Sequence, residues 1–235
     1  MEVVISGIFG RMGTYVFKVL SLRENIKVIG GIDDNKNFST VNIKSKLSEF
    51  ETCDVLIDFS AREAAYENIK WALEHNIKVL CGTTGMTKEE TEELKQLAIK
   101  NKVSMIICPN FALLASVMYK IIETFKDDFL DIDLIETHHK KKKDAPSGTA
   151  KDFANILNFN YADIQSVRVN HQIASHEIII NNSGERLTIK HEILSRDAFL
   201  VGFLKSLDLI SKNDRLIIST SLKDYHNIIN NLSVL

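Results

Sequence analysis

The sequence predicts an α/β fold, in which a doubly wound parallel sheet is joined to an α+β region with a mixed sheet. Two observations support this. Over roughly the first hundred residues, short apolar runs alternate with amphipathic helical stretches. After Pro109, longer alternating runs flank a turn at residues 182–184, as in a hairpin. A strand–helix–strand crossover returns parallel, so the first pattern indicates a parallel sheet covered on both faces.

The first region has five expected strands separated by helices. The strands are the apolar runs at 2–6, 25–33, 53–60, 77–82 and 102–108. Apolar residues at helical spacing predict helices over 15–23, 61–75 and 88–100. In the second region we expect strands at 131–139, 175–182 and 185–194, then helices at 197–210 and 222–235.

Composition bounds the possible functions. The 235 residues include 29 Lys and Arg against 31 Asp and Glu, a net charge of −2. Such a chain has no general attraction for nucleic acid or anionic membranes, so any basic site must be local. Three cysteines in apolar runs indicate buried, reduced thiols, and neither a signal peptide nor a membrane span is expected. The cytoplasm is the predicted compartment.

A glycine segment, GIFGRMG, follows the first strand and opens the first helix. Gly7, Gly10 and Gly13 allow a tight turn and close approach of the backbone to a pyrophosphate at the helix N-terminus, as in Rossmann-like domains. Asp33 ends the second strand, where a carboxylate can accept hydrogen bonds from ribose hydroxyls. An ordinary turn with an exposed Asp is the alternative.

Further features bear on the cofactor. The loops at 82–85 and 108–111 follow strands and should face the same crevice as the glycine segment. Asp34 follows Asp33, and two carboxylates repel a ribose 2′-phosphate, although Lys36 lies near enough to soften this effect. We therefore expect NADH to serve at least as well as NADPH.

The stretch ETHHKKKKDAPSGTA, residues 136–150, carries the candidate chemistry. His138 and His139 end an extended run and should point to opposite faces, so one could donate a proton while the other binds. Ser147 is a good N-cap for a following helix, whose first N–H groups, at Gly148 and Thr149, could hold an anion. Most of the four lysines should be solvated. A dicarboxylate site fits best; nucleic-acid and metal sites fit poorly, for want of aromatics and of further metal ligands.

In this order, GIFGRMG, VLIDFS, CGTTG, PNF, ETHHKKKKDAPSGTA and SRDAFLVG resemble the 4-hydroxy-tetrahydrodipicolinate reductase (dihydrodipicolinate reductase) family of lysine and diaminopimelate biosynthesis. The similarity spans about residues 2–202. It implies NADH- or NADPH-dependent reduction of a cyclic dicarboxylate to tetrahydrodipicolinate with loss of water. It also implies a homotetramer assembled through the substrate domain.

The resemblance assigns roles to individual residues. His138 falls at the proton donor and Lys142 at the second catalytic position, whereas His139, Ser147, Gly148 and Thr149 fall at the substrate site. No metal is implied. The positions implied for the nucleotide are Gly7, Ile8, Phe9, Gly10, Arg11, Met12, Asp33, Gly82, Thr83, Thr84, Cys108, Pro109, Asn110 and Phe111. The implied domains are a dinucleotide-binding domain, 1–109 with 205–235 returning to it, and a substrate-binding and oligomerisation domain, 110–204.

Two segments depart from the family pattern. In NFALLASV, Ala112 and Leu114 replace a serine and a glycine, and in RVNHQIASH, Asn170 and Ala174 replace two glycines. Two alternatives stay open. A non-catalytic nucleotide-sensing protein of this fold would not need the histidine–lysine segment. A dehydrogenase of the aspartate-semialdehyde type would need a catalytic cysteine in its second domain, and no cysteine follows Cys108.

Overall fold

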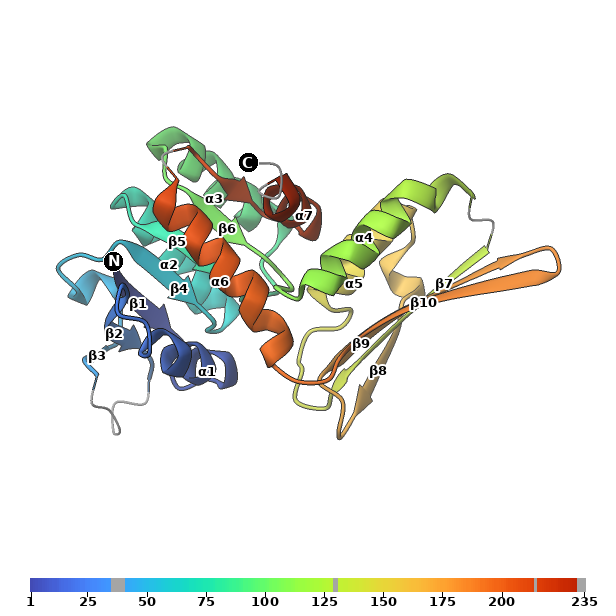
Figure 1. Cartoon of the computed structure of the whole chain (residues 1–235), viewed down its shortest axis with the longest axis horizontal. Coiled ribbons are helices and arrows are strands. Elements are labelled where there is room, and N and C mark those ends of the chain that lie inside the picture. The colour runs from blue at the N-terminus through green and yellow to red at the C-terminus, as the bar shows by residue number, and fades with distance from the viewer. Residues whose placement is uncertain (35–40, 129–130, 214, 232–235) are drawn as a thin grey trace. The chain divides into compact units, whose positions relative to one another are not determined.

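The computed structural model describes residues 1–34, 41–128, 131–213 and 215–231, and the chain divides into two compact units (Figure 1). The first unit comprises Met1–Cys108 and Phe203–Thr220, and the second comprises Pro109–Gly202 and Ser221–Leu235. Among the described residues, no helix is long and apolar enough to cross a membrane.

The first unit is built on a parallel sheet in the order β11-β6-β5-β4-β1-β2-β3. This confirms the predicted doubly wound class. The strands are β1 (Glu2–Ser6), β2 (Lys27–Ile32), β3 (Ile43–Lys44), β4 (Val55–Asp58), β5 (Lys78–Cys81), β6 (Met105–Ile107) and β11 (Ile218–Ser219). The inner residues of the central strands, Val3–Ile5, Val55–Ile57 and Val79–Cys81, are apolar and buried, as expected where helices cover both faces of a sheet (Figure 1).

The helices of this unit are α1 (Arg11–Leu20), α2 (Arg62–Glu74), α3 (Lys88–Asn101) and most of α6 (Asp197–Lys212). One face of the sheet contributes Val4, Leu56 and Val79 to a core with Ile69 of α2 and Leu94 of α3. Helix α3 begins at a capping box between Thr87 and Glu90. These helices hold the carboxyl ends of the strands, and the loops that follow them, along one edge of the sheet.

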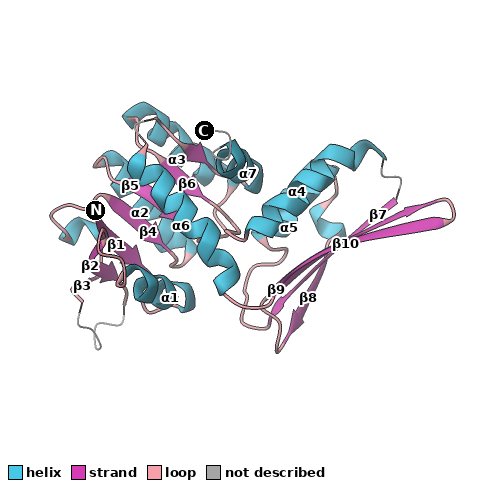
Figure 2. Cartoon of the chain, in the orientation of Figure 1, coloured by secondary structure: helices cyan, strands magenta, loops and turns pink. Residues whose placement is uncertain are grey.

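The second unit contains a four-stranded mixed sheet in the order β10-β9-β7-β8, with α4 (Leu113–Phe125) and α5 (Gly148–Leu157) against one face (Figure 2). Its strands are β7 (Asp131–His139), β8 (Gln165–Val169), β9 (Ala174–Asn182) and β10 (Glu185–Ile193). Strand β7 pairs parallel with β8 and antiparallel with β9, and β9–β10 is the predicted hairpin. Burial alternates along β7, so its even-numbered residues face the helices.

The tail differs from its prediction. Residues 205–235 were expected to return to the first unit, but only Phe203–Thr220 does so, and α7 (Leu222–Asn231) packs on α4 and α5 in the second unit. A hydrogen bond from the amide of Leu222 to Asp152 Oδ2 on α5, 2.7 Å long, anchors the start of α7 there. The predicted last residues, 232–235, lie outside the described part of the chain.

Candidate active site

The glycine segment forms the turn between β1 and α1. Gly7 has a φ of +69°, which a residue with a side chain adopts only under strain, and its amide donates to Ile32 O at 2.8 Å. A Cβ on Gly13 would lie 2.0 Å from Gly7 O. Gly10 is the N-cap of α1 and brings no side chain to the helix terminus. The backbone therefore presents a close-packed helix N-terminus of the kind that binds phosphate.

The other nucleotide residues of this segment differ in exposure. Ile8 is buried, Phe9 and Arg11 are exposed, and Met12 is half-buried. Asp33 follows β2, and its Oδ2 accepts a hydrogen bond from the amide of Phe9 at 3.1 Å. This contact places the Asp33 carboxylate beside the glycine turn, and its ribose-binding role stays a prediction. Lys36, which could offset the acidic pair, lies outside the described residues.

A buried carboxylate not singled out from the sequence organises the next loops. Asp58 ends β4 and is completely buried. Its Oδ1 accepts from the amide of Ser60 at 3.0 Å, from the Ser60 hydroxyl at 2.8 Å and from Thr83 Oγ1 at 2.6 Å. The amide of Gly82 also donates to Asp58 O at 2.9 Å. Asp58 thus ties the predicted nucleotide loop at 82–84 to strand β4. Thr84 of this loop is half-buried.

The loop at 108–111 spans the division between the units. Cys108 ends the first unit, and its amide donates to Cys81 O at 2.9 Å. Pro109 begins the second unit. Asn110 is buried, and its Oδ1 accepts from the amide of Ala112 at 3.0 Å, just before α4. The Phe111 ring packs edge-on against Tyr225, with 5.7 Å between ring centroids. The three cysteines of the chain are buried and none of them forms a disulfide, as predicted.

His138 lies on the helix-facing side of β7 beside a buried acid. Its Nδ1 contacts Glu136 Oε2, and Glu136 Oε1 accepts from Arg168 Nη2 at 2.8 Å. Burial raises the pKa of Glu136, but the hydrogen bonds from His138 and Arg168 outweigh it and lower that pKa to about 2. Glu136 therefore stays ionised next to the candidate proton donor. Sequence reasoning assigned no role to Glu136 or Arg168.

His139 and Lys142 lie next to this group in the chain. His139 is half-buried and belongs to the opposite face of β7 from His138, as the alternation predicted. Lys142 is also half-buried, whereas Lys140, Lys141 and Lys143 are exposed. The Lys142 amide donates to His139 O at 3.0 Å, and its Nζ lies 2.8 Å from Asp144 Oδ1. Lys142 therefore differs from the other three lysines of the run in its burial, and it forms an ion pair with Asp144.

Ser147 caps α5, as predicted. Its Oγ accepts from the amide of Ala150 at 3.2 Å and lies 3.2 Å from Nε2 of the buried His176. Desolvation and the neighbouring His138 and His191 lower the pKa of His176 to about 3, so its ring is neutral near pH 7. Gly148 and Thr149 form the first turn of α5. An uncharged ring therefore supports the capped helix N-terminus, which the sequence had identified as an anion site.

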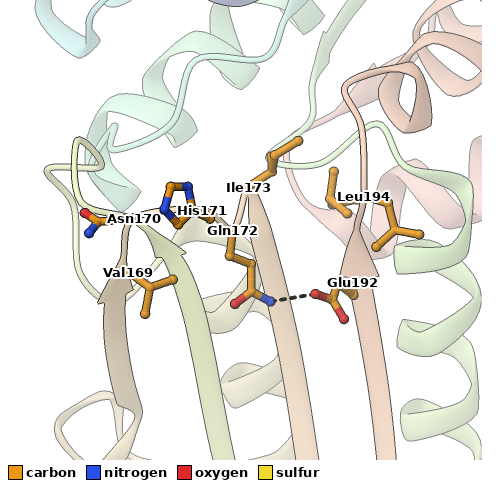
Figure 3. Close-up of a pocket in the computed structure, with 8 residues that line it drawn as sticks. Val169, Asn170, His171, Gln172, Ile173, Glu192 and Leu194 are labelled. Atoms are coloured by element: carbon orange, nitrogen blue, oxygen red, sulfur yellow. Dashed lines mark hydrogen bonds between the residues drawn. The ribbon is translucent and has the colours of Figure 1, made fainter.

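A pocket of about 540 Å³ lies elsewhere in the second unit (Figure 3). It lies at one end of the sheet, and Gln172 Nε2 donates across it to Glu192 Oε1 at 3.0 Å. It contains none of the predicted site residues but includes Asn170, one of the departures from the family pattern. Its lining residues are Val169, Asn170, His171, Gln172, Ile173, Glu192, Ile193 and Leu194.

Comparison with known proteins identifies the family. Residues 1–111 match the family described as dihydrodipicolinate reductase, N-terminus, and residues 111–222 match its C-terminus. The chain belongs to the dihydrodipicolinate reductase family. A 4-hydroxy-tetrahydrodipicolinate reductase of Dictyoglomus turgidum is 34% identical, with 91% of this chain and 94% of that protein covered. One from Archaeoglobus fulgidus is 32% identical, with 92% and 96% covered.

Solved structures agree with this family assignment. A dipicolinate-bound dihydrodipicolinate reductase from Paenisporosarcina sp. TG-14 has a TM-score of 0.74 and 26% identity, with 93% of this chain and 97% of that chain covered. GenD2 from gentamicin A biosynthesis, in complex with NAD, has a TM-score of 0.69 at 9% identity, with 99% and 92% covered. The second likeness concerns the fold alone.

Proposed function

We propose that the protein reduces 4-hydroxy-tetrahydrodipicolinate to tetrahydrodipicolinate, with NADH or NADPH as reductant, in lysine and diaminopimelate biosynthesis. The observation that carries this proposal is the Glu136–His138 pair, followed in the same family-specific segment by Lys142 and the capped start of α5. The dipicolinate-bound relative supports a planar cyclic dicarboxylate as the ligand. The reaction adds one hydride and one proton to the substrate, and one water leaves.

The first unit would hold the nucleotide. The Gly7–Gly13 turn packs so closely against neighbouring backbone atoms that a Cβ on Gly7 or Gly13 would collide with them, and Asp33 is held beside the turn by the Phe9 amide. The pyrophosphate would bind at the start of α1 and the adenine ribose at Asp33. Loops 82–84 and 108–111 would contact the nicotinamide end. When bound, NADH or NADPH supplies the hydride.

The second unit would supply the proton and hold the substrate. With its Nδ1 engaged by Glu136, His138 has Nε2 available to protonate the ring carbon that becomes negatively charged on hydride addition. Lys142 and the first amides of α5 would hold a carboxylate, with Ser147, Gly148, Thr149 and His139 around it. Charged contacts of this kind stabilise the developing charge more strongly when water is excluded.

Assembly and location extend the same proposal. We propose a homotetramer formed through the second unit, in the cytoplasm, where buried cysteines outside any disulfide, such as those of this chain, stay reduced. Exposed apolar side chains on that unit support association: Leu114, Val117, Ile121 and Phe125 on α4, and Val167 and Leu187 on the sheet. Light scattering should give four times the chain mass of 26.6 kDa, and a monomer at micromolar concentration would contradict the assembly.

A coupled assay tests the proposed reaction. Aspartate semialdehyde and pyruvate are condensed by an added synthase, and the absorbance of NADH is followed after addition of the purified protein. We expect oxidation that requires the synthase and both of its substrates. NADH that stays reduced with the complete mixture, or oxidation that does not need the synthase, would refute the assigned reaction.

A further inference from the structure

Glu136 is a completely buried carboxylate whose two oxygens have different partners. It lies on β7 two residues before His138, so both side chains face the helices of the second unit. Oε2 contacts His138 Nδ1, and Oε1 accepts from Arg168 Nη2 at 2.8 Å. A buried carboxylate is costly unless each oxygen is satisfied, and here the two partners are the candidate proton donor and an arginine.

Arg168 connects this acid to the lysine segment. It lies on β8 as the register partner of His138 on β7, and its side chain is mostly buried. Besides Glu136, its Nη2 donates to Asp144 O at 2.7 Å. Asp144 in turn pairs through Oδ1 with Lys142 Nζ at 2.8 Å. One guanidinium therefore joins the strand that carries His138 to the loop that carries Lys142.

We propose that Glu136 and Arg168 are positioning residues for the reaction. Glu136 keeps a proton on His138 Nδ1, and Arg168 fixes the orientation of that carboxylate and of the Lys142 loop. This inference rests on the proposed function, in which His138 is the proton donor. Neither Glu136 nor Arg168 is required to touch the substrate.

The assignment of protons follows from what each group can donate or accept. A guanidinium only donates, so Glu136 Oε1 must accept from Arg168. An ionised carboxylate only accepts, so the remaining oxygen requires a donor at His138 Nδ1. His138 keeps this Nδ1 proton both before and after it gives up the other one. The proton that is transferred is therefore the one on Nε2.

The Glu136→Gln variant distinguishes an orienting role of the carboxylate from a role in packing. Glutamine has nearly the same shape as glutamate, but it has one hydrogen-bond acceptor fewer. The single amide oxygen must face Arg168, which has no lone pair to offer, and the NH₂ group is left facing His138 Nδ1. Nδ1 must then become an acceptor, so the neutral ring takes the other tautomer. An Nδ1–H would instead face the amide NH₂, donor against donor. The loss of an orienting acid in this manner is known to produce the wrong tautomer in serine proteases.

The experiment combines kinetics with ¹⁵N NMR of histidine-labelled protein, in which the His138 signals are identified by their loss in His138→Gln. In wild type we expect a protonated Nδ1, and in Glu136→Gln an unprotonated one. We expect kcat to fall on the order of 100-fold, with KM within about threefold of wild type, because general acid catalysis is lost rather than binding. Glu185→Gln, an exposed acid at the β9–β10 hairpin, is the matched control and should leave both readouts unchanged.

A double variant shows whether a change in Glu136→Gln comes from the lost acceptor or from misfolding. In Glu136→Gln combined with Arg168→Met, the amide is free to turn its oxygen toward His138, and the Nδ1 proton should return. A kcat within threefold of wild type in Glu136→Gln, an Nδ1 that keeps its proton there, or an unprotonated Nδ1 in the double variant would overturn the inference. The NMR signals need no substrate, so they test this inference even if the wild-type protein failed the coupled assay.

Discussion

Gly13→Ala should specifically damage nucleotide binding. The added Cβ would lie 2.0 Å from Gly7 O and 2.8 Å from the Gly7 carbonyl carbon. Ordinary contact begins at 3.4 Å, so the turn and helix α1 must separate by about 3.4 − 2.0 = 1.4 Å. Both atoms belong to backbone, and no side chain can rotate away. A shift of this size would break a backbone hydrogen bond to the pyrophosphate, which contributes about 1.5–3 kcal/mol when the acceptor is charged.

The assay is titration of the protein with NADH, followed by the fluorescence of the nucleotide. A loss of about 1.5–3 kcal/mol raises Kd roughly 10- to 150-fold. Gly184→Ala is the control because Gly184 also has a positive φ, +82°, but a Cβ there meets nothing within 4 Å and the hairpin lies in the second unit. If Gly13→Ala folds and binds NADH as tightly as Gly184→Ala does, the glycine turn is not the pyrophosphate site.

Three further predictions concern the lysine run, the choice of cofactor and a buried acid. Lys142→Ala should lower kcat/KM for the dicarboxylate about 10- to 100-fold in the coupled assay, because a charged hydrogen bond is lost; equal losses at Lys140, Lys141 and Lys143 would indicate generic electrostatics instead. NADH should give a kcat/KM at least equal to that of NADPH, since Asp33 and Asp34 repel a 2′-phosphate, and a strong preference for NADPH in steady-state kinetics would contradict this. Burial raises the pKa of Asp152 from 3.8 to about 6, so the stability it contributes is present below pH 3.8 and is lost as pH rises through 6, by at most about 3 kcal/mol. Asp152→Asn should therefore gain stability over wild type as pH rises from 4 to 8 in urea unfolding, and a constant difference would refute the assignment.

Much of the fold follows from local pattern. The five strands expected in the first unit and the hairpin of the second are apolar or alternating runs bounded by turns, and the structure contains each of them. Three strands were missed. β3 and β11 have two residues each and exist only by pairing with β2 and β6, and β8 is partly exposed and pairs at the edge of the sheet. Periodicity within a segment carries no information about such partners.

Helix α4 was missed for a different reason. Its N-cap, Ala112, offers no side-chain hydrogen bond, so the usual start signal is absent. Its apolar residues also occupy both faces: Ala115 and Ile122 are buried, whereas Leu114 and Phe125 are exposed. Exposed apolar residues of this kind blur the boundary between the buried face and the polar face, where Lys120 pairs with Glu123.

Candidate catalytic residues could be grouped from the sequence only where one short segment contains them. His138, Lys142 and Ser147 share fifteen residues, so their spacing was visible. Arg168 is the β8 neighbour of His138 only because of the parallel register of two strands thirty residues apart. The bond from Thr83 to Asp58 likewise needs β4 and β5 side by side. Such contacts depend on which strands pair and in which register, and neither can be read from the pattern of residues within one segment.

The kcat of His138→Gln in the coupled assay, measured beside wild-type protein, tests the proposed proton donor most directly. Glutamine occupies nearly the same space but cannot donate a titratable proton. We expect synthase-dependent NADH oxidation by wild type and a fall in kcat on the order of 10²- to 10⁴-fold in the variant, with NADH affinity unchanged. A variant that folds, binds NADH and turns over at the wild-type rate would contradict the proposed proton donor and the site built around it.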